Sequence, residues 1–317
     1  MRGAIALLAL PAVLFSNDTL MTLGAGGLVP AKSSAISIES EDLEISARLI
    51  KVKYVFRNHT ASAIEGIVAF PLPAINGGDV EHVPMSIPSK DPVNFVDFRI
   101  TAGGKAIQPN VAAKAFAKDR DITERLRGLR IPVSVIDKGL GAAIQRVPAS
   151  ERKRLQDEEL IVCEDHGCWA TWESRVRFWW RQHFPAGATV AIEHTYRPVV
   201  GGAYIVYGND GAETIKPYCG GADALAQIAA QKKAHPPKDL DDIALYENRI
   251  QYILTTANNW SGPIRKFRLS VVTESPDDIV ASCAPGLQRV APGRYEAFRT
   301  GFRPEKELDV LILTRRR

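Results

Sequence analysis

The ten residues CEDHGCWATW, which begin at Cys163, hold two cysteines, a histidine, two carboxylates and two tryptophans. Cys163, Cys168 and His166 are residue types that bind zinc, and the carboxylates between them could add an oxygen ligand. A zinc site of this kind needs a second group of ligands. His183 or His194 could contribute to it, but their spacing gives no independent support, so we expect no bound metal.

The meaning of the four cysteines depends on the compartment in which the chain folds. In an exported protein an even number of cysteines is typical of disulfides, whereas in the cytosol it favours metal or redox chemistry. A redox pair favours two intervening residues at a helix start, and Cys163 and Cys168 are separated by four. Of the three possible pairings we favour Cys163 with Cys168 and Cys219 with Cys283.

The N-terminus resembles a secretory signal peptide. Arg2 gives a minimal positive region, residues 3–15 are uncharged and mostly apolar, and Ser16 precedes a polar stretch. We therefore predict a signal peptide over residues 1–16 and a periplasmic or secreted mature protein. The apolar run is shorter than the roughly 20 residues that a membrane span needs, so no transmembrane segment is expected. The alternative is a buried first strand or helix.

Four of the five tryptophans follow closely on one another: Trp169, Trp172, Trp179 and Trp180. Such side chains could form a surface that stacks on sugar rings or binds another protein. The alternative is that they belong to the core. If residues 175–184 form a strand, Trp179 and Trp180 point to opposite faces, and no more than one of the two lies in the core.

The sequence contains no common catalytic motif. The nucleophile elbow G-x-S-x-G, the zinc motif H-E-x-x-H and the P-loop are all missing. Glu193 and His194 are neighbours, but in a strand they would point to opposite faces, and His194 would lie on the apolar side as a core histidine. We therefore expect a protein that is not an enzyme and has no cofactor, although dispersed catalytic residues remain an alternative.

Charge gives no indication of a nucleic-acid partner. The 40 lysines and arginines are nearly balanced by 36 aspartates and glutamates, which leaves a net charge of +4. A nucleic-acid-binding protein would gather basic residues on one face. The partner expected for this chain is an envelope protein or a glycan.

Alternation of apolar and polar residues is the dominant pattern. In residues 50–57 apolar side chains alternate mostly with charged ones, which is typical of a strand with one buried face. Further strands are predicted at residues 66–70, 95–101, 175–184, 190–197, 203–207, 249–256, 267–273 and 308–314. Helical patterns occur at residues 112–129, 148–160 and 222–234.

These patterns predict a mainly β fold of the α+β type. We expect residues 17–146 to form a β-sandwich-like domain with a C-terminal helix. Residues 147–317 should form a second β-rich domain with helical insertions.

Several stretches resemble a bacterial family of exported proteins known as domain of unknown function 4424. They are NDTLMTLGAGGLVPAKSSAISIESEDLEIS, VKYVFRN and AFPLP near the start, then RFWWRQHFPAGATVAIEHTYRPVVGG and YILTTANNWSGPIRKFRLSVV. The resemblance covers nearly the whole mature chain. It implies export and a β-rich fold, and it supplies no catalytic residues.

A second resemblance concerns residues 36–130. The order of IVAFPLP, FVDFRITAGGKAIQ and AAKAFAK is similar to that of vault and inter-alpha-trypsin type domains, which are β-sandwiches. Such sandwiches usually serve as interaction modules. We therefore expect an exported, non-catalytic β-sandwich protein that binds a ligand or partner. The alternative is an envelope hydrolase or carbohydrate-active protein with its site near residues 169–180.

Overall fold

The computed structural model describes residues 19–24, 27–83, 85–165 and 167–315. The predicted signal peptide, residues 1–16, lies outside the described residues. Strands dominate, as expected for a mainly β protein, and they form three large sheets and one small hairpin. Among the described residues, no helix is long and apolar enough to cross a membrane.

Sheet B, with eight strands, is the centre of the molecule. In spatial order its strands are β21 (Gln288–Ala291), β22 (Arg294–Phe302), β19 (Ile264–Val272), β3 (Ile36–Ile45), β4 (Ile50–Asn58), β15 (Thr189–Tyr196), β8 (Arg99–Ala102) and β9 (Lys105–Ile107). Strand β4 confirms the predicted alternation, because Val52, Tyr54 and Phe56 are buried while Lys51 and Lys53 are exposed. Strand β3 pairs with β19 in parallel, residues 41–45 against 267–271.

Sheets A and C lie against different parts of sheet B. Sheet A contains β11 (Arg120–Asp121), β10 (Asn110–Ala117), β14 (Glu173–Phe184), β5 (Ile64–Pro71), β1 (Thr19–Gly24) and β2 (Gly27–Ala31), with β6 (Ile75–Asn76) beside β14. Sheet C contains β20 (Ile279–Ser282), β23 (Leu308–Thr314), β18 (Ile243–Tyr252), β16 (Val200–Gly201) and β7 (Met85–Ser86), with β17 (Tyr204–Val206) beside β18.

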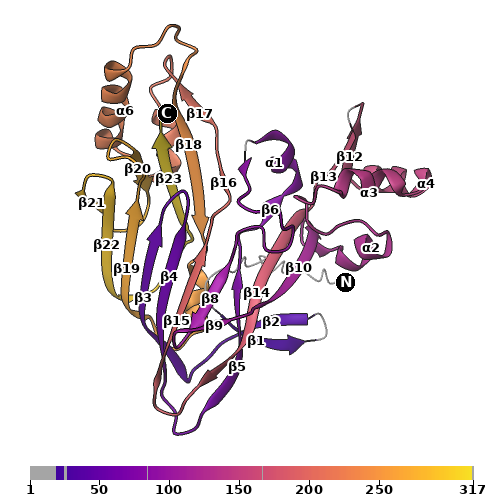
Figure 1. Ribbon diagram of the computed structural model, residues 1–317, viewed down its shortest axis with the longest axis vertical. Coiled ribbons are helices and arrows are strands. Elements are labelled where there is room, and N and C mark those ends of the chain that lie inside the picture. Colours follow the sequence, from indigo (N-terminus) through magenta and orange to yellow (C-terminus); the bar gives the residue numbers. More distant parts are fainter. Residues whose placement is uncertain (1–18, 25–26, 84, 166, 316–317) are drawn as a thin grey trace, which may run out of the picture.

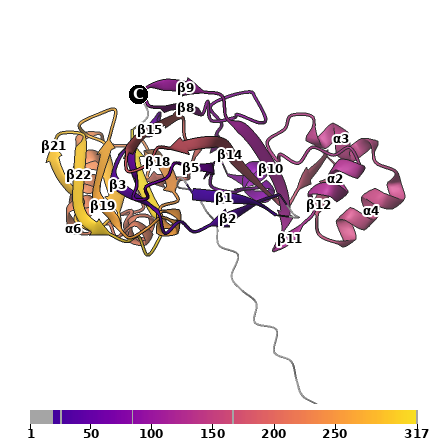
Figure 2. The ribbon, with the colours of Figure 1, turned by 90° about the horizontal axis from the view of Figure 1, so that it is seen from below.

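Helices lie mainly at the two ends of the molecule, with α6 at one end and α2 to α4 at the other (Figures 1 and 2). The helices are α1 (Gly77–His82), α2 (Thr123–Gly128), α3 (Leu140–Arg146), α4 (Ala149–Asp157), α5 (Ala212–Ile215) and α6 (Ala222–Ala234), with short 3-10 turns η1 (Lys216–Tyr218) and η2 (Thr255–Asn259). The hairpin of β12 (Ile161–Glu164) and β13 (Gly167–Ala170) forms sheet D next to α3 and α4.

One large apolar cluster contains side chains from sheets A, B and C. Between sheets A and B, the rings of Phe178 and Phe98 stack with centroids 4.3 Å apart. Between sheets B and C, the hydroxyls of Tyr54 and Tyr252 are 2.8 Å apart. A second cluster fills the opposite face of sheet C, where α5 and α6 cover it with Ile215 and Ile228.

The predicted boundary at residue 146 does not separate two sheets. Strands from residues 17–146 pair with strands from residues 147–317 in seven places: β5, β6 and β10 pair with β14, β4 and β8 pair with β15, β3 pairs with β19, and β7 pairs with β16. Both parts also contribute to the same apolar cluster. The resemblance of residues 36–130 to vault-type sandwiches stays a prediction, since these residues supply strands to both sheet A and sheet B.

The helix predicted over residues 112–129 is largely wrong. Residues 110–117 form β10, which pairs with β14 from Asn110 to Phe116, and only α2 at residues 123–128 is helical. Alanine-rich composition favours a helix locally, but pairing along a whole neighbouring strand outweighs that weak preference. The helices predicted at 148–160 and 222–234 are confirmed as α4 and α6.

Candidate functional site

Both predicted disulfides are present. Cys163 and Cys168 face one another across the β12–β13 hairpin. Cys219 follows η1 and is joined to Cys283, which follows β20. His166 lies outside the described residues, and those that are described contain no group of three or more His, Cys, Asp or Glu placed to bind a metal.

The four tryptophans that the sequence suggests as a ligand or partner surface do not lie together on one surface. Trp172, just before β14, and Trp180, on the inward phase of β14, are each only 1% exposed, so neither can serve as a binding surface. Trp179 is half-buried on the opposite face, which confirms the prediction for this pair. Trp169 is also half-buried, with its ring edge to face with His82. Trp169 and Trp179 stay candidates for a partner surface.

His194 is a core histidine. It is 1% exposed, and the rings of Tyr54, Phe70 and Trp180 surround it with centroids 5.0 to 5.6 Å away. None of the pockets described below is lined by His194 or by a tryptophan. A hydrolase site near residues 169–180 would need a cleft lined by tryptophan, histidine and carboxylate side chains. None of these three pockets has such a lining.

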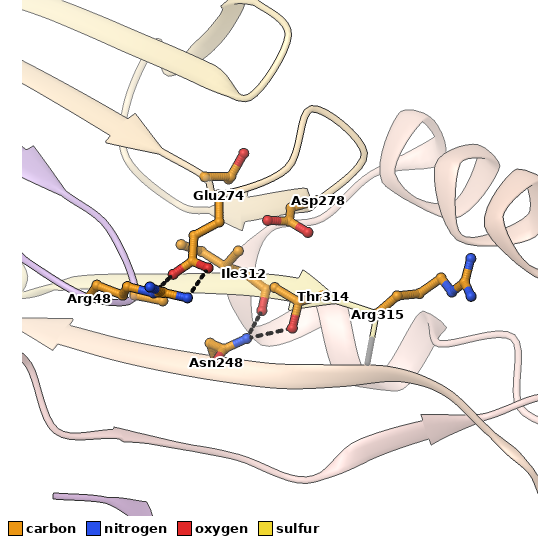
Figure 3. Close-up of a pocket in the computed structure, with 9 residues that line it drawn as sticks. Arg48, Asn248, Glu274, Asp278, Ile312, Thr314 and Arg315 are labelled. Atoms are coloured by element: carbon orange, nitrogen blue, oxygen red, sulfur yellow. Dashed lines mark hydrogen bonds and ion pairs between the residues drawn. The ribbon is translucent and has the colours of Figure 1, made fainter. Parts of the chain in front are cut away.

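Figure 3 shows a small polar pocket of about 260 Å³ at one end of the B–C sandwich. Arg48, in the β3–β4 turn, binds both carboxylate oxygens of Glu274, with 2.7 Å between Nη2 and Oε2. Asn248 donates from Nδ2 to the carbonyl of Ile312 and to Oγ1 of Thr314, both at 3.1 Å. These polar groups are already bound to one another, so a ligand would have to displace existing contacts.

A second pocket, of about 310 Å³, lies where residues 72–76 meet β7, β16 and β18. Its lining is mainly apolar and includes Tyr196, which is 3% exposed. Burial raises the pKa of the Tyr196 phenol well above its ordinary value. The Tyr196 hydroxyl makes no hydrogen bond with a described residue.

The largest of the three pockets, about 890 Å³, lies at the other end of the B–C sandwich; we call it the edge pocket. Strand β20 ends at Ser282 opposite Val310, whereas β23 extends two residues further, to Leu308 opposite Tyr252. The first two residues of β23, Leu308 and Asp309, therefore have no strand on that side. The chain leaves sheet C there through residues 283–287, and the gap beneath this connection is the pocket.

The part of the edge pocket that sheet B lines is mainly apolar. Phe267, Leu269 and Ala297 come from sheet B and are buried. Phe302 stacks on Phe267 with ring centroids 4.7 Å apart. Leu254, Leu308 and Ala284 also line the pocket. A volume of several hundred Å³ with an apolar lining and a few polar groups is typical of small-molecule sites.

Arg299 is a cation placed on this apolar wall. On β22 it follows the inward phase of Tyr295 and Ala297, and its cross-strand partner is the buried Phe267. Arg299 is half-buried, and its one hydrogen bond among the described residues goes from Nη1 to the carbonyl of Phe298, at 3.3 Å. It forms no ion pair with any described carboxylate.

Carboxylates near the pocket are held by other groups. Glu307 accepts hydrogen bonds from the backbone amides of Leu254 and Thr255, at 2.6 and 3.1 Å, and from the Thr255 hydroxyl. Asp309 accepts from the side-chain amide of Gln251 at 3.2 Å. At the mouth, Arg303 and Lys306 are exposed and form no ion pair with a described residue.

Sequence reasoning missed this site because residues 294–302 were not predicted as a strand. A signal was present in RYEAFRTGF, where an alternating reading puts Arg299 on the same side as Tyr295 and Ala297. The same reading puts Phe298 on the outer side, where it is 58% exposed. In a strand, a charged residue among the inward-facing positions, as at Arg299, and an aromatic residue among the outward-facing ones, as at Phe298, are exceptions to the usual pattern. Such exceptions indicate a candidate binding site.

Comparison with known proteins identifies a family. The model described as "Domain of unknown function (DUF4424)" matches residues 16–311. No curated protein matches the sequence. Among solved structures, a candidate nutrient-binding protein from Legionella pneumophila is 16% identical with a TM-score of 0.44, covering 90% of this chain and 69% of its own. An M1 zinc metallopeptidase from Deinococcus radiodurans is 7% identical with a TM-score of 0.27, covering 89% and 43%.

Proposed function

We propose a function for this chain, which belongs to the DUF4424 family: it is an exported, non-catalytic binding protein of the bacterial envelope. The observation that carries the proposal is the edge pocket, whose volume of about 890 Å³ and mainly apolar wall on sheet B suit a small molecule with an apolar body. The pocket is open in the structure, with strands of sheets B and C and the connecting segments between them as its lining. Preformed apolar walls reduce the entropy lost on binding.

Export is supported by the signal-like residues 1–16 and by the two disulfides. The test is to express the full chain with its own N-terminus in a Gram-negative host and to fractionate the cells. We expect the protein in the periplasmic fraction, with Asn17 as its first residue and no cysteine that can be alkylated before reduction. A cytoplasmic protein with an uncleaved N-terminus and free thiols would overturn export.

Ligand binding is tested with phenylnaphthylamine, a neutral dye whose fluorescence rises when water is excluded from it. We expect saturable binding by the purified protein. Ala284→Trp should abolish most of it, because Ala284 lines the pocket from a loop and an indole there would occupy the space. The matched control is Ala61→Trp, which places the same side chain in an exposed loop and should bind like the parent protein.

Both variants should retain the thermal unfolding midpoint of the parent to within a few degrees, because each changes a loop residue. Equal dye binding by Ala284→Trp and the parent protein would show that the edge pocket is not the binding site. An absence of saturable binding in all three proteins would reject the pocket as a site for apolar molecules.

A further inference from the structure

We infer that the edge pocket takes an amphipathic organic acid, and that Arg299 binds its anionic group. The inference rests on the proposed binding function and names its ligand class. An apolar body would lie against Phe267, Leu269 and Ala297, and a carboxylate or sulfonate would meet the guanidinium. The pocket offers both kinds of contact within one wall, since Arg299 and Phe267 are directly opposite one another on β22 and β19.

The argument begins with the cost of placing a cation on an apolar wall. A half-buried guanidinium loses part of its hydration, and this loss is normally offset by a carboxylate partner. Arg299 forms no ion pair with the described residues, and two carboxylates that line the same pocket accept hydrogen bonds from other groups. Glu307 is bound by backbone amides, and Asp309 is bound by Gln251. An anionic ligand would supply the missing partner.

The guanidinium of Arg299 packs against a glycine. Its guanidinium lies against the backbone of Gly286, where a Cβ would come 2.4 Å from Nη2 and 2.9 Å from Cζ. Gly286 also has φ +72°, a conformation that other residues rarely adopt. The connection between sheets C and B therefore leaves room for the guanidinium next to its backbone. A guanidinium presents a planar fork of donors that suits carboxylate or sulfonate oxygens.

Charges of both signs lie around the pocket besides Arg299. Arg303 and Lys306 are exposed lining residues without an ion pair among the described residues. Glu305 is an exposed carboxylate in the same loop and opposes them. With Glu307 and Asp309, the lining holds as many anionic as cationic side chains, so the preference for an anion rests on Arg299 and not on the net charge of the pocket.

The experiment compares two dyes that differ by one sulfonate. Phenylnaphthylamine is neutral, and anilinonaphthalene sulfonate carries the same rings with an added anionic group. We expect the parent protein to bind the sulfonate about tenfold more tightly, as one charge-assisted contact would give. Arg299→Met should remove this preference and leave affinity for the neutral dye unchanged, while Arg299→Lys should restore part of it.

Arg57→Met is the matched control, because Arg57 is an exposed arginine on β4 of the same sheet with no ion pair among the described residues. It should leave both affinities unchanged. Gly286→Ala provides a second variant. It should displace the Arg299 guanidinium and lower the affinity for the sulfonate dye without changing the affinity for the neutral dye. Circular dichroism and the unfolding midpoint report whether each variant is folded.

The outcomes separate the two proposals. If neither dye binds the parent protein, the binding function itself fails. If the neutral dye binds and Arg299→Met leaves the affinity for the sulfonate unchanged, the pocket stands and the assignment of an organic acid to Arg299 is overturned. If Arg57→Met lowers the affinity for the sulfonate dye as much as Arg299→Met does, the preference for the sulfonate reflects general surface charge. The assignment of an organic acid to Arg299 is then also overturned.

Discussion

Tyrosines in the core differ in whether their hydroxyl groups form hydrogen bonds. The hydroxyls of Tyr54 and Tyr252 are 2.8 Å apart, and each lies 3.4 Å from Oε1 of the buried Glu41. Tyr196 is equally buried, but its hydroxyl makes no hydrogen bond with a described residue. A buried hydroxyl without a partner destabilises the folded state, whereas a bonded one is neutral or stabilising.

This difference predicts opposite effects of two identical substitutions. Tyr196→Phe should leave the free energy of unfolding unchanged or raise it by up to about 1 kcal/mol, because no hydrogen bond to a described residue is lost. Tyr54→Phe should lower it by about 1 to 3 kcal/mol, because Tyr252 and Glu41 lose a partner. Urea unfolding measures both. Equal losses for the two variants would contradict this view of the core.

At the scale of elements, strand β14 has one face that packs into the core and one face that is partly exposed. Its residues alternate from Ser174 to Gln182 between the buried and the outer face. Trp180 packs edge to face with His194 at 5.5 Å and donates from Nε1 to Gln182 at 3.2 Å. Trp179, one position earlier, is half-buried on the outer face.

Neighbouring tryptophans should therefore differ strongly when truncated. Trp180→Ala is expected to cost about 3 to 5 kcal/mol of unfolding free energy, the usual range for a large core side chain. Trp179→Ala should cost about 1 kcal/mol, typical of a partly exposed site. Chemical denaturation of both variants provides the comparison. A larger loss for Trp179→Ala would mean that the faces of β14 are assigned wrongly.

The two disulfides should also differ in their contribution to stability. Cys219 and Cys283 are 64 residues apart, and Cys163 and Cys168 are 5 apart. A longer closed loop restricts the unfolded chain more, so replacing both cysteines by alanine should cost about 4 kcal/mol for the first pair and about 2 kcal/mol for the second. Unfolding in urea of the two double variants tests the order. The reverse order would show that local strain or packing outweighs loop entropy.

Elements with a regular pattern were predictable from the sequence, and those defined by distant partners were not. Strands β4 and β15 follow from alternation over residues 50–57 and 190–197, and β23 follows from the mainly apolar run of residues 308–314. Residues 112–117 were mistaken for a helix because their alanines favour one locally, and only the pairing with β14 makes them a strand. The edge pocket depends on where β20 stops relative to β23, which is a property of register and not of local composition.

At the scale of the whole molecule, the first and second halves of the chain share their sheets. Strand β4 has β15 as one neighbour, and β5 has β14. A fragment of residues 17–146 would lose these pairings and expose the apolar faces of β3, β4 and β5.

We therefore expect the isolated fragment 17–146 to show no cooperative unfolding transition. The intact mature chain, residues 17–317, serves as the control and should unfold with a sigmoidal transition. Far-ultraviolet circular dichroism during a urea titration distinguishes the two. A sigmoidal transition in the fragment would show that this segment is an independent domain.

The parallel pairing of β3 with β19 has a consequence for how the protein reaches this structure. Residues 41–45 cannot pair with residues 267–271 until those residues have been synthesised. Sheet B is therefore complete only after most of the chain has left the ribosome. Contacts between such distant segments slow folding, because a long loop must be ordered before they form. During that interval the edge of β3 stays open to other chains, which makes a chaperone or dilute conditions important for the yield of native protein.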